Sequence, residues 1–151
     1  MPSKPGSIVH VEIHSPAPEK TQRFYESVFG WKFESVPAMN YTTFTAPSPP
    51  NGGIMSPMEG EGPTVMNYIL STEIDETIRK IELAGGAILV PKSEIPKVGW
   101  FAIFRDPAGV TQAVYQDVAR PARPAAARAR KAKRAAKKVK RGRRSGRKGR
   151  R

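Results

Sequence analysis

Residues 91–116, PKSEIPKVGWFAIFRDPAGVTQAVYQ, decide the fold, because they predict two adjacent strands joined by a tight turn. Residues 98–105 are rich in aromatic and β-branched side chains, which suit a half-buried pleated surface. In the turn at 106–109, Asp favours the first position, Pro presets φ at the second and Gly tolerates a positive φ at the last. The chain then returns through residues 110–116. This hairpin is expected to close the folded part of the protein.

The order of elements upstream of the hairpin occurs twice. Residues 7–14 alternate between apolar and polar side chains, which predicts a strand with one apolar face and one polar face. A helix that ends at Gly30 follows, and three short strands come after it. The second strand–helix pair begins near residue 65 and its helix ends at Gly85, again before three strands. The order β-α-β-β-β is therefore predicted twice, with the two glycines at equivalent helix ends.

The expected architecture is α+β, with two curved sheets that each carry a helix on the outer face. A doubly wound parallel sheet is less compatible with the pattern, because there are only two helices among eight strands. The modules are expected at about residues 7–57 and 64–116, within a domain at 7–117 that follows a flexible leader at 1–6. The first helix is expected to bury the face with Phe24, Tyr25 and Val28, and Phe29 and Trp31 are expected in the core.

Charge divides the 151-residue chain, whose net charge is +13, into two unlike parts. Residues 118–151 hold 17 of the 26 Lys and Arg residues and no Asp or Glu. Residues 1–117 hold the other 9 basic residues and all 13 acidic ones, so their net charge is −4. About 116 residues suffice for one domain with its own core.

Several classes of protein are excluded by what the sequence lacks. There is no cysteine, so there is no disulfide framework, no thiolate metal site and no Cys nucleophile. No apolar run approaches the ~20 residues that span a bilayer. The N-terminus has no apolar signal-peptide core. A soluble, cytoplasmic protein is expected.

Four stretches carry a family resemblance: IVHVEI, RFYESVFGWKF, NYILSTEIDETIRKIELAGGAILVPK and VGWFAIFRDPAGVTQAVYQ. Together they resemble the vicinal oxygen chelate superfamily, the glyoxalase and bleomycin-resistance type, and its lactoylglutathione-lyase-related branch. The resemblance covers about residues 7–116. It implies two βαβββ modules that form a half-open barrel around a pocket, and it implies a homodimer. Metal-dependent members hold a divalent ion with one side chain from each of four strands and use it as a Lewis acid.

Carried over residue by residue, this resemblance leaves most of the metal site missing. His10 falls on the first ligand position, Asn67 on the second and Ala113 on the position of the closing strand. The remaining position falls within residues 52–55, which offer no oxygen or imidazole side chain. An alanine methyl and a thioether are poor ligands for a hard or borderline divalent ion. No metal and no other cofactor is therefore expected, and a divalent ion held through His10 is the alternative.

If the fold is as the resemblance implies, alternate residues of four strands line the pocket. This gives an apolar, aromatic wall with a few polar groups, the usual composition of a small-molecule site. The residues expected to contact the ligand are His10, Glu12, Asn67, Ile69, Trp100, Phe104, Ala113 and Tyr115. His10 and Glu12 are the best candidates for acid–base catalysis, and a purely structural role for both stays open. His14, near a strand end, is expected to be solvated.

The basic segment at 118–151 is predicted to be a disordered tail, because it has too few large apolar residues to bury a core. Dense positive charge on a flexible chain binds phosphate backbones by counterion release, and without an aromatic residue to stack on bases the binding is expected to be independent of sequence. Its composition resembles the basic tails of linker histones and bacterial nucleoid proteins, which implies association with the nucleoid. RNA, an anionic membrane or no dedicated partner stay open. The residues expected to bind nucleic acid are Arg128, Arg130, Lys131, Lys133, Arg134, Lys137, Lys138, Lys140, Arg141, Arg143, Arg144, Arg147, Lys148, Arg150 and Arg151.

The sequence therefore predicts a metal-independent small-molecule-binding protein of the glyoxalase and bleomycin-resistance type with a nucleic-acid-binding tail. Two alternatives stay open. One is a metal-dependent lyase, or an enzyme of the hydroxylase or dioxygenase type, from the same superfamily. The other is a nucleic-acid-associated scaffold that binds no ligand.

Overall fold

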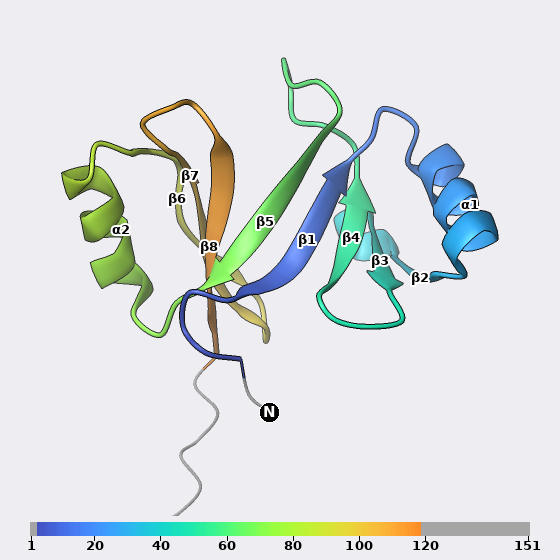
Figure 1. The fold of residues 1–151 in the computed structure, drawn as a ribbon, viewed down its shortest axis with the longest axis horizontal. Coiled ribbons are helices and arrows are strands. Elements are labelled where there is room, and N and C mark those ends of the chain that lie inside the picture. Colours follow the sequence, from blue (N-terminus) through green and yellow to red (C-terminus); the bar gives the residue numbers. More distant parts are fainter. Residues whose placement is uncertain (1–2, 119–151) are drawn as a thin grey trace, which may run out of the picture. The chain divides into compact units, whose positions relative to one another are not determined.

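Two successive β-α-β-β-β modules make up residues 3–118, the part of the chain that the computed structural model describes (Figure 1). The first module consists of β1 (Ile8–His14), α1 (Pro18–Phe29), β2 (Lys32–Val36), β3 (Tyr41–Thr45) and β4 (Asn51–Met55), with a 3-10 turn at Pro37–Met39. The second consists of β5 (Thr64–Leu70), α2 (Ile74–Leu83), β6 (Ala87–Ile95), β7 (Gly99–Arg105) and β8 (Thr111–Asp117). The predicted α+β class and the repeated element order are confirmed. The predicted basic tail, apart from Val118, lies outside the described residues.

All eight strands of this region belong to one sheet, in the order β2-β3-β4-β1-β5-β8-β7-β6. The two modules meet where β1 pairs antiparallel with β5, side by side in the middle of Figure 1. Within each module the first strand pairs parallel with the last, β1 with β4 and β5 with β8. The outer strands β2 and β6 do not pair with each other, so the sheet stays half open, as expected. Neither helix of residues 3–118 is long and apolar enough to cross a membrane.

The junction between strand and helix shows the internal repeat at atomic detail. Ser15 Oγ lies 2.7 Å from Thr21 Oγ1 and accepts a hydrogen bond from the backbone N–H of Ala17 at 3.1 Å. Ser71 Oγ lies 2.8 Å from Thr77 Oγ1 and accepts from the N–H two residues later, also at 3.1 Å. Each serine thus satisfies a free N–H before a helix. We call the alignment of the two modules that superimposes Ser15 on Ser71 the serine register.

The predicted turn of the closing hairpin is confirmed. Asp106 Oδ1 accepts hydrogen bonds at 2.9 Å from the backbone N–H groups of Ala108 and Val110. Gly109 has a φ of 97°, and its N–H donates to the Asp106 carbonyl at 3.0 Å. The Asp side chain and the Gly backbone therefore both hold the turn, and β7 and β8 pair antiparallel on either side of it.

The two helices pack differently. Ile74 of α2 is fully buried against Ala102 and Val114. By contrast, α1 buries none of its residues. The expectation that α1 packs Phe24 and Val28 into the core is wrong, since they are 56% and 55% exposed.

The packing of aromatic rings below α1 explains the difference. Trp31 stacks on the buried Phe44 with ring centroids 4.4 Å apart, and Tyr25 of α1 stacks on Trp31 at 4.7 Å. The helix therefore rests on the rings of this stack, and its remaining apolar side chains stay outside. Phe29, also expected in the core, is 54% exposed for the same reason.

Replacing Gly52 of β4 by alanine should lower the free energy of unfolding by about 1–3 kcal/mol, the range for overpacked interiors. A Cβ at this position would overlap the backbone carbonyl oxygen of Val11 and the ring of Phe44. Chemical denaturation followed by circular dichroism measures the loss. Gly62→Ala is the matched control, because a Cβ there meets no atom within 4 Å. Equal stabilities of the two variants would contradict the close approach of β1 to β4.

Candidate functional site

Strand register sorts the side chains onto two faces of the sheet. Glu12 pairs with Gly53 on one side and with Met66 on the other, and Tyr68 pairs with Ala113. Directly paired residues share a face, so these side chains all lie on the same one. We call it the helix-free face. The opposite, helix-covered face carries the side chains that pack below α1 and α2.

A chain of hydrogen bonds runs across the helix-free face through Glu61, His14, Glu12 and Tyr68. Glu12 Oε1 lies 2.8 Å from His14 Nε2, and Glu61 Oε2 lies 2.9 Å from His14 Nδ1. The Tyr68 hydroxyl donates to both carboxylate oxygens of Glu12 at 3.2 Å. Glu12, His14 and Tyr68 are 7%, 1% and 8% exposed. We call these four residues the polar cluster.

A second pair of side chains lies beside the polar cluster. His10 Nε2 lies 2.7 Å from the Tyr41 hydroxyl. The ring of Tyr68 meets the ring of His10 edge to face, with centroids 5.3 Å apart. Tyr68 therefore contacts both groups, and every buried side-chain nitrogen and oxygen of residues 3–118 has a hydrogen-bond partner.

The two histidines have opposite electrostatic environments. Burial lowers the pKa of His14, but its hydrogen bonds to Glu12 and Glu61 outweigh burial, and the net pKa is raised. His14 then donates from both ring nitrogens as an imidazolium. Burial also lowers the pKa of His10, and here it outweighs the charge of Glu12, so His10 is neutral. The polar cluster therefore holds two acidic side chains and one histidine whose pKa they raise.

Two tyrosines keep their protons. Burial raises the pKa of Tyr41 and of Tyr68, and the negative charge of Glu12 raises both further. Both phenols are therefore hydrogen-bond donors at any physiological pH. The arrangement can present oriented donors and acceptors to a bound molecule and can exchange a proton through Glu12 and His14.

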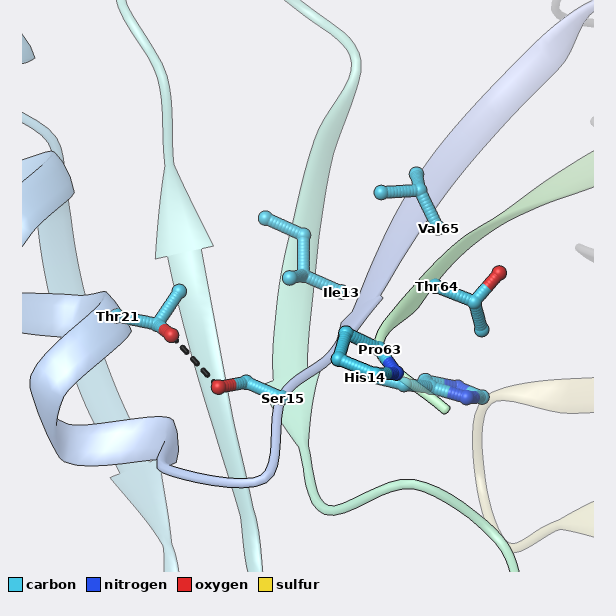
Figure 2. Close-up of a pocket in the computed structure, with 7 residues that line it drawn as sticks. All are labelled: Ile13, His14, Ser15, Thr21, Pro63, Thr64 and Val65. Atoms are coloured by element: carbon cyan, nitrogen blue, oxygen red, sulfur yellow. Dashed lines mark hydrogen bonds between the residues drawn. The ribbon is translucent and has the colours of Figure 1, made fainter. Parts of the chain in front are cut away.

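A small cavity of about 260 Å³ lies at the end of β1, where His14 contributes to its wall (Figure 2). Figure 2 shows the hydroxyls of Ser15 and Thr21 joined by a hydrogen bond at one side, with Val65 and Thr64 of β5 at the other. The cavity also contacts Ile13 and Pro63. This volume lies just below the ~300–1,000 Å³ of small-molecule sites.

The structure brings together half of the eight predicted ligand-contacting residues. His10, Glu12, Ala113 and Tyr115 lie on the helix-free face. The placement of the other four on the same face is wrong, because the register puts them on the helix-covered face: Asn67, Ile69, Trp100 and Phe104. The alternation of side chains fixes which residues share a face but not which face is inward, and both faces of this sheet carry apolar residues.

Sequence reasoning missed part of the polar cluster. The expectation that His14 is solvated is wrong, since the residue is 1% exposed. The sequence did carry a signal for it: His14 is two residues after Glu12 on β1, so the two side chains lie on the same face. Tyr68 could have been found from the repeat, because the serine register aligns it with Glu12. Glu61 lies in the loop before β5 and Tyr41 at the start of β3, and the sequence gives no signal for either.

The donor set does not fit the family-type metal ion. In the serine register, His10 corresponds to Met66, and not to Asn67 as predicted, whose side chain lies on the other face. Strand pairing relates the other two positions: Gly53 of β4 pairs with Glu12, and Ala113 of β8 pairs with Tyr68, the counterpart of Glu12. These four positions supply one imidazole and no oxygen ligand. Residues 3–118 contain no group of three His, Cys, Asp or Glu arranged to hold an ion.

Known proteins resemble the chain in sequence and in fold. Residues 7–47 match the bleomycin resistance protein-like N-terminal family. A glyoxylase-like domain-containing protein of Didymella fabae is 34% identical over 119 residues, which cover 72% of this chain and 92% of the relative. The putative glyoxylase CFP32 of Mycobacterium tuberculosis (strain CDC 1551 / Oshkosh) is 31% identical over 113 residues, which cover 72% of this chain and 43% of the relative. This chain therefore spans less than half the length of that relative.

One solved structure shows the same fold at low sequence identity. The crystal structure of methylmalonyl-CoA epimerase from Mycobacterium tuberculosis has a TM-score of 0.58 and 13% identity. The similarity covers 78% of this chain and 93% of that one.

The two histidines, the only ones in the chain, should titrate on opposite sides of pH 6.5. His14 should titrate above it, because two carboxylates stabilise the imidazolium, and His10 below it, because burial favours the neutral ring. Imidazole resonances in an NMR pH titration measure both values, and His10→Gln and His14→Gln assign them.

These two pKa shifts also determine whether each histidine stabilises the fold at low or at high pH. His14 stabilises the fold below pH 6.5, and this stabilisation is lost as the pH rises through its raised pKa. His10 acts in the opposite sense, and its contribution is lost as the pH falls below 6.5. Two histidines that titrate together would contradict the described cluster.

Proposed function

Because the chain belongs to the glyoxylase-like proteins of the vicinal oxygen chelate superfamily, we propose that it binds a small molecule against the helix-free face without a family-type metal ion. The observation that carries this proposal is the hydrogen-bonded chain from Glu61 through His14 and Glu12 to Tyr68. It lies on the face that carries His10, the position that the resemblance assigns to the first metal ligand. The cluster supplies oriented polar groups there, which is what a small-molecule site requires of its few polar residues.

The chemistry of the cluster favours a ligand with a hydrogen-bond donor or a positive charge. A carboxylate has about four lone-pair positions. His14 and Tyr68 do not use all of those on Glu12, so an acceptor position is left for the ligand. The cluster contains two acidic residues and one histidine, and this composition acts in the same direction. The apolar side chains of Met66 and Ile103 on the same face supply a surface for the rest of the ligand.

Of the two predicted catalytic residues, we propose Glu12 as the group that exchanges a proton with a bound molecule. Its carboxyl group accepts the hydrogen bonds of both His14 and Tyr68. His10 is neutral and bonded to Tyr41, so its role is to form the wall of the site. Lyase or hydroxylase-type chemistry would use the same residues and is the alternative to binding alone.

A thermal-shift screen of small metabolites and antibiotics on the whole chain should find ligands that stabilise it. Glu12→Gln should weaken the binding of such a ligand by roughly 10- to 100-fold, because hydrogen bonds to charged groups contribute about 1.5–3 kcal/mol. Isothermal titration calorimetry measures the difference. Glu34→Gln is the matched control, because Glu34 is exposed on β2, away from the cluster.

Metal analysis of the purified protein separates this proposal from the metal-dependent alternative. We expect less than stoichiometric Zn, Ni, Mn or Fe, and no change on His10→Ala. Stoichiometric metal that is lost in His10→Ala would refute the metal-independent site. Ligand affinities that are equal in the wild type and Glu12→Gln would refute the role of the cluster.

A second function rests on the charge of residues 118–151. We propose that this segment, with 17 basic and no acidic residues, binds nucleic acid without reading its sequence and holds the protein at the nucleoid. The domain at 1–117 carries a net charge of −4 and would not bind phosphate backbones by itself. We also propose that the domain pairs with a second copy, which would cover the exposed Phe24 and Val28 of α1.

A chain truncated after Ala119 should lose its affinity for duplex DNA. If about 8 cations engage the duplex, a plot of log K against log salt for the whole chain should have a slope near −7. Fluorescence anisotropy at several salt concentrations measures it. The ligand profile of the truncated chain should stay unchanged. DNA binding that survives the truncation would assign it to the domain instead.

A further inference from the structure

A second cavity, of about 650 Å³, lies beside the start of α1. Its walls come from α1, from β2 and β3, and from the end of β4. The volume falls within the ~300–1,000 Å³ of small-molecule sites. The polar cluster on the helix-free face contributes no residue to it. We propose that this cavity is a separate site for a small anion, bound through Lys20 and Arg23.

The two cations come from one stripe of the helix. Lys20 and Arg23 are three positions apart on α1, so their side chains lie next to each other, and both line the cavity. Lys20 has no ion-pair partner within the described part of the chain. The start of α1, at Ala17 and Pro18, also lines the cavity, so the positive end of the helix dipole adds to the field.

One acidic residue, Glu19, lines the same cavity. Its carboxylate lies 3.9 Å from Arg23 Nη1, and the two side chains are 89% and 72% exposed. Exposed pairs of this kind contribute little to stability because water screens them. Arg23 is therefore available to a better acceptor, and a bound anion can replace Glu19 as its partner.

The wall formed by the strands carries polar side chains that make no hydrogen bond within the described residues. Ser35 of β2, Thr42 of β3 and Ser56 after β4 each present a hydroxyl, and Asn40 presents an amide. Within residues 3–118 none of these four side chains makes a hydrogen bond to another protein group. Hydroxyl and amide donors opposite two cations are the groups that hold phosphate and carboxylate oxygens.

The second module keeps only one of the two cations, because Arg23 corresponds to Arg79 in the serine register. In the serine register Lys20 corresponds to Glu76 of α2, which pairs with Lys80 at 2.7 Å. The inner face of α2 packs on Ala102 and Val114. The cations and the cavity therefore occur together in the module whose helix buries no residue.

The cavity and the polar cluster are neighbours. Tyr41 lines the cavity, and its hydroxyl bonds His10, which lies beside the cluster. The two sites therefore share this residue but hold different side chains. An anion in the cavity and a ligand at Glu12 would lie on opposite faces of the sheet, because Ser35 and Thr42 pair one residue out of phase with Gly53, the neighbour of Glu12.

Inorganic phosphate is the first probe, titrated into the ¹⁵N-labelled whole chain at constant ionic strength set with chloride. We expect saturable shifts of the backbone amides of Ser35, Thr42 and Ser56. The double variant Lys20→Gln/Arg23→Gln should bind at least tenfold more weakly. The control Arg79→Gln/Lys80→Gln removes two charges from α2, where Arg79 corresponds to Arg23, and should bind as the wild type does. Binding of phosphate to residues 118–151 is the same in all three proteins and does not report on these amides.

A parallel titration with succinate distinguishes phosphate esters from carboxylates as the class of ligand. Saturation by either anion at the three amides supports the site and names its class. The proposal is overturned if neither anion shifts these amides, or if the Lys20→Gln/Arg23→Gln variant binds as tightly as the wild type. Failure here leaves the Glu12 site untouched, because Glu12 does not line this cavity.

Discussion

The buried carboxylate of Glu12 is the constraint that the centre of this structure has to satisfy. A charge removed from water is costly unless it is paired and hydrogen bonded. His14 supplies the pair from the same strand, and Tyr68 supplies its hydroxyl from β5. Tyr68 reaches Glu12 only if β1 and β5 keep their antiparallel register, because a slip by one residue would turn Tyr68 to the other face. The polar cluster therefore specifies how the two modules join.

The same constraint explains the unusual burial of β1. Its polar residues Glu12 and His14 are more buried than its apolar Val9 and Ile13, which are only partly buried. Gly53, next to Glu12 on β4, has no side chain, and the ring of Tyr41 occupies the space that a Cβ would need. Tyr41 is thereby placed beside His10. The glycine, the tyrosine and the two histidines form one arrangement around a single carboxylate.

Sequence reasoning was accurate where a local rule decides the outcome. The turn at Asp106, the helix end at Gly30 and the repeated order of elements follow from side-chain chemistry and periodicity over short stretches. It failed where a contact between distant segments decides. Period-two alternation correctly placed Trp100 and Phe104 on one face of β7. That face is the helix-covered one, because α2 packs on it, and this contact is not visible in the local sequence. The exposure of Phe24 depends on Trp31 and Phe44, which stack below α1 and come from outside the helix. The periodicity of the helix sequence alone does not reveal this contact.

Glu12, His14 and Glu61 resemble a set of metal ligands by composition, yet their geometry opposes that role. A histidine binds a metal ion through a ring nitrogen that carries a lone pair. Both ring nitrogens of His14 face carboxylate oxygens, at 2.8 and 2.9 Å, and the carboxylates hold the ring in its protonated form. A divalent ion would have to displace a proton from an imidazolium that two carboxylates and burial enclose. His14 therefore occupies the position between the acids that a cation would take, and its own charge performs that cation's structural role.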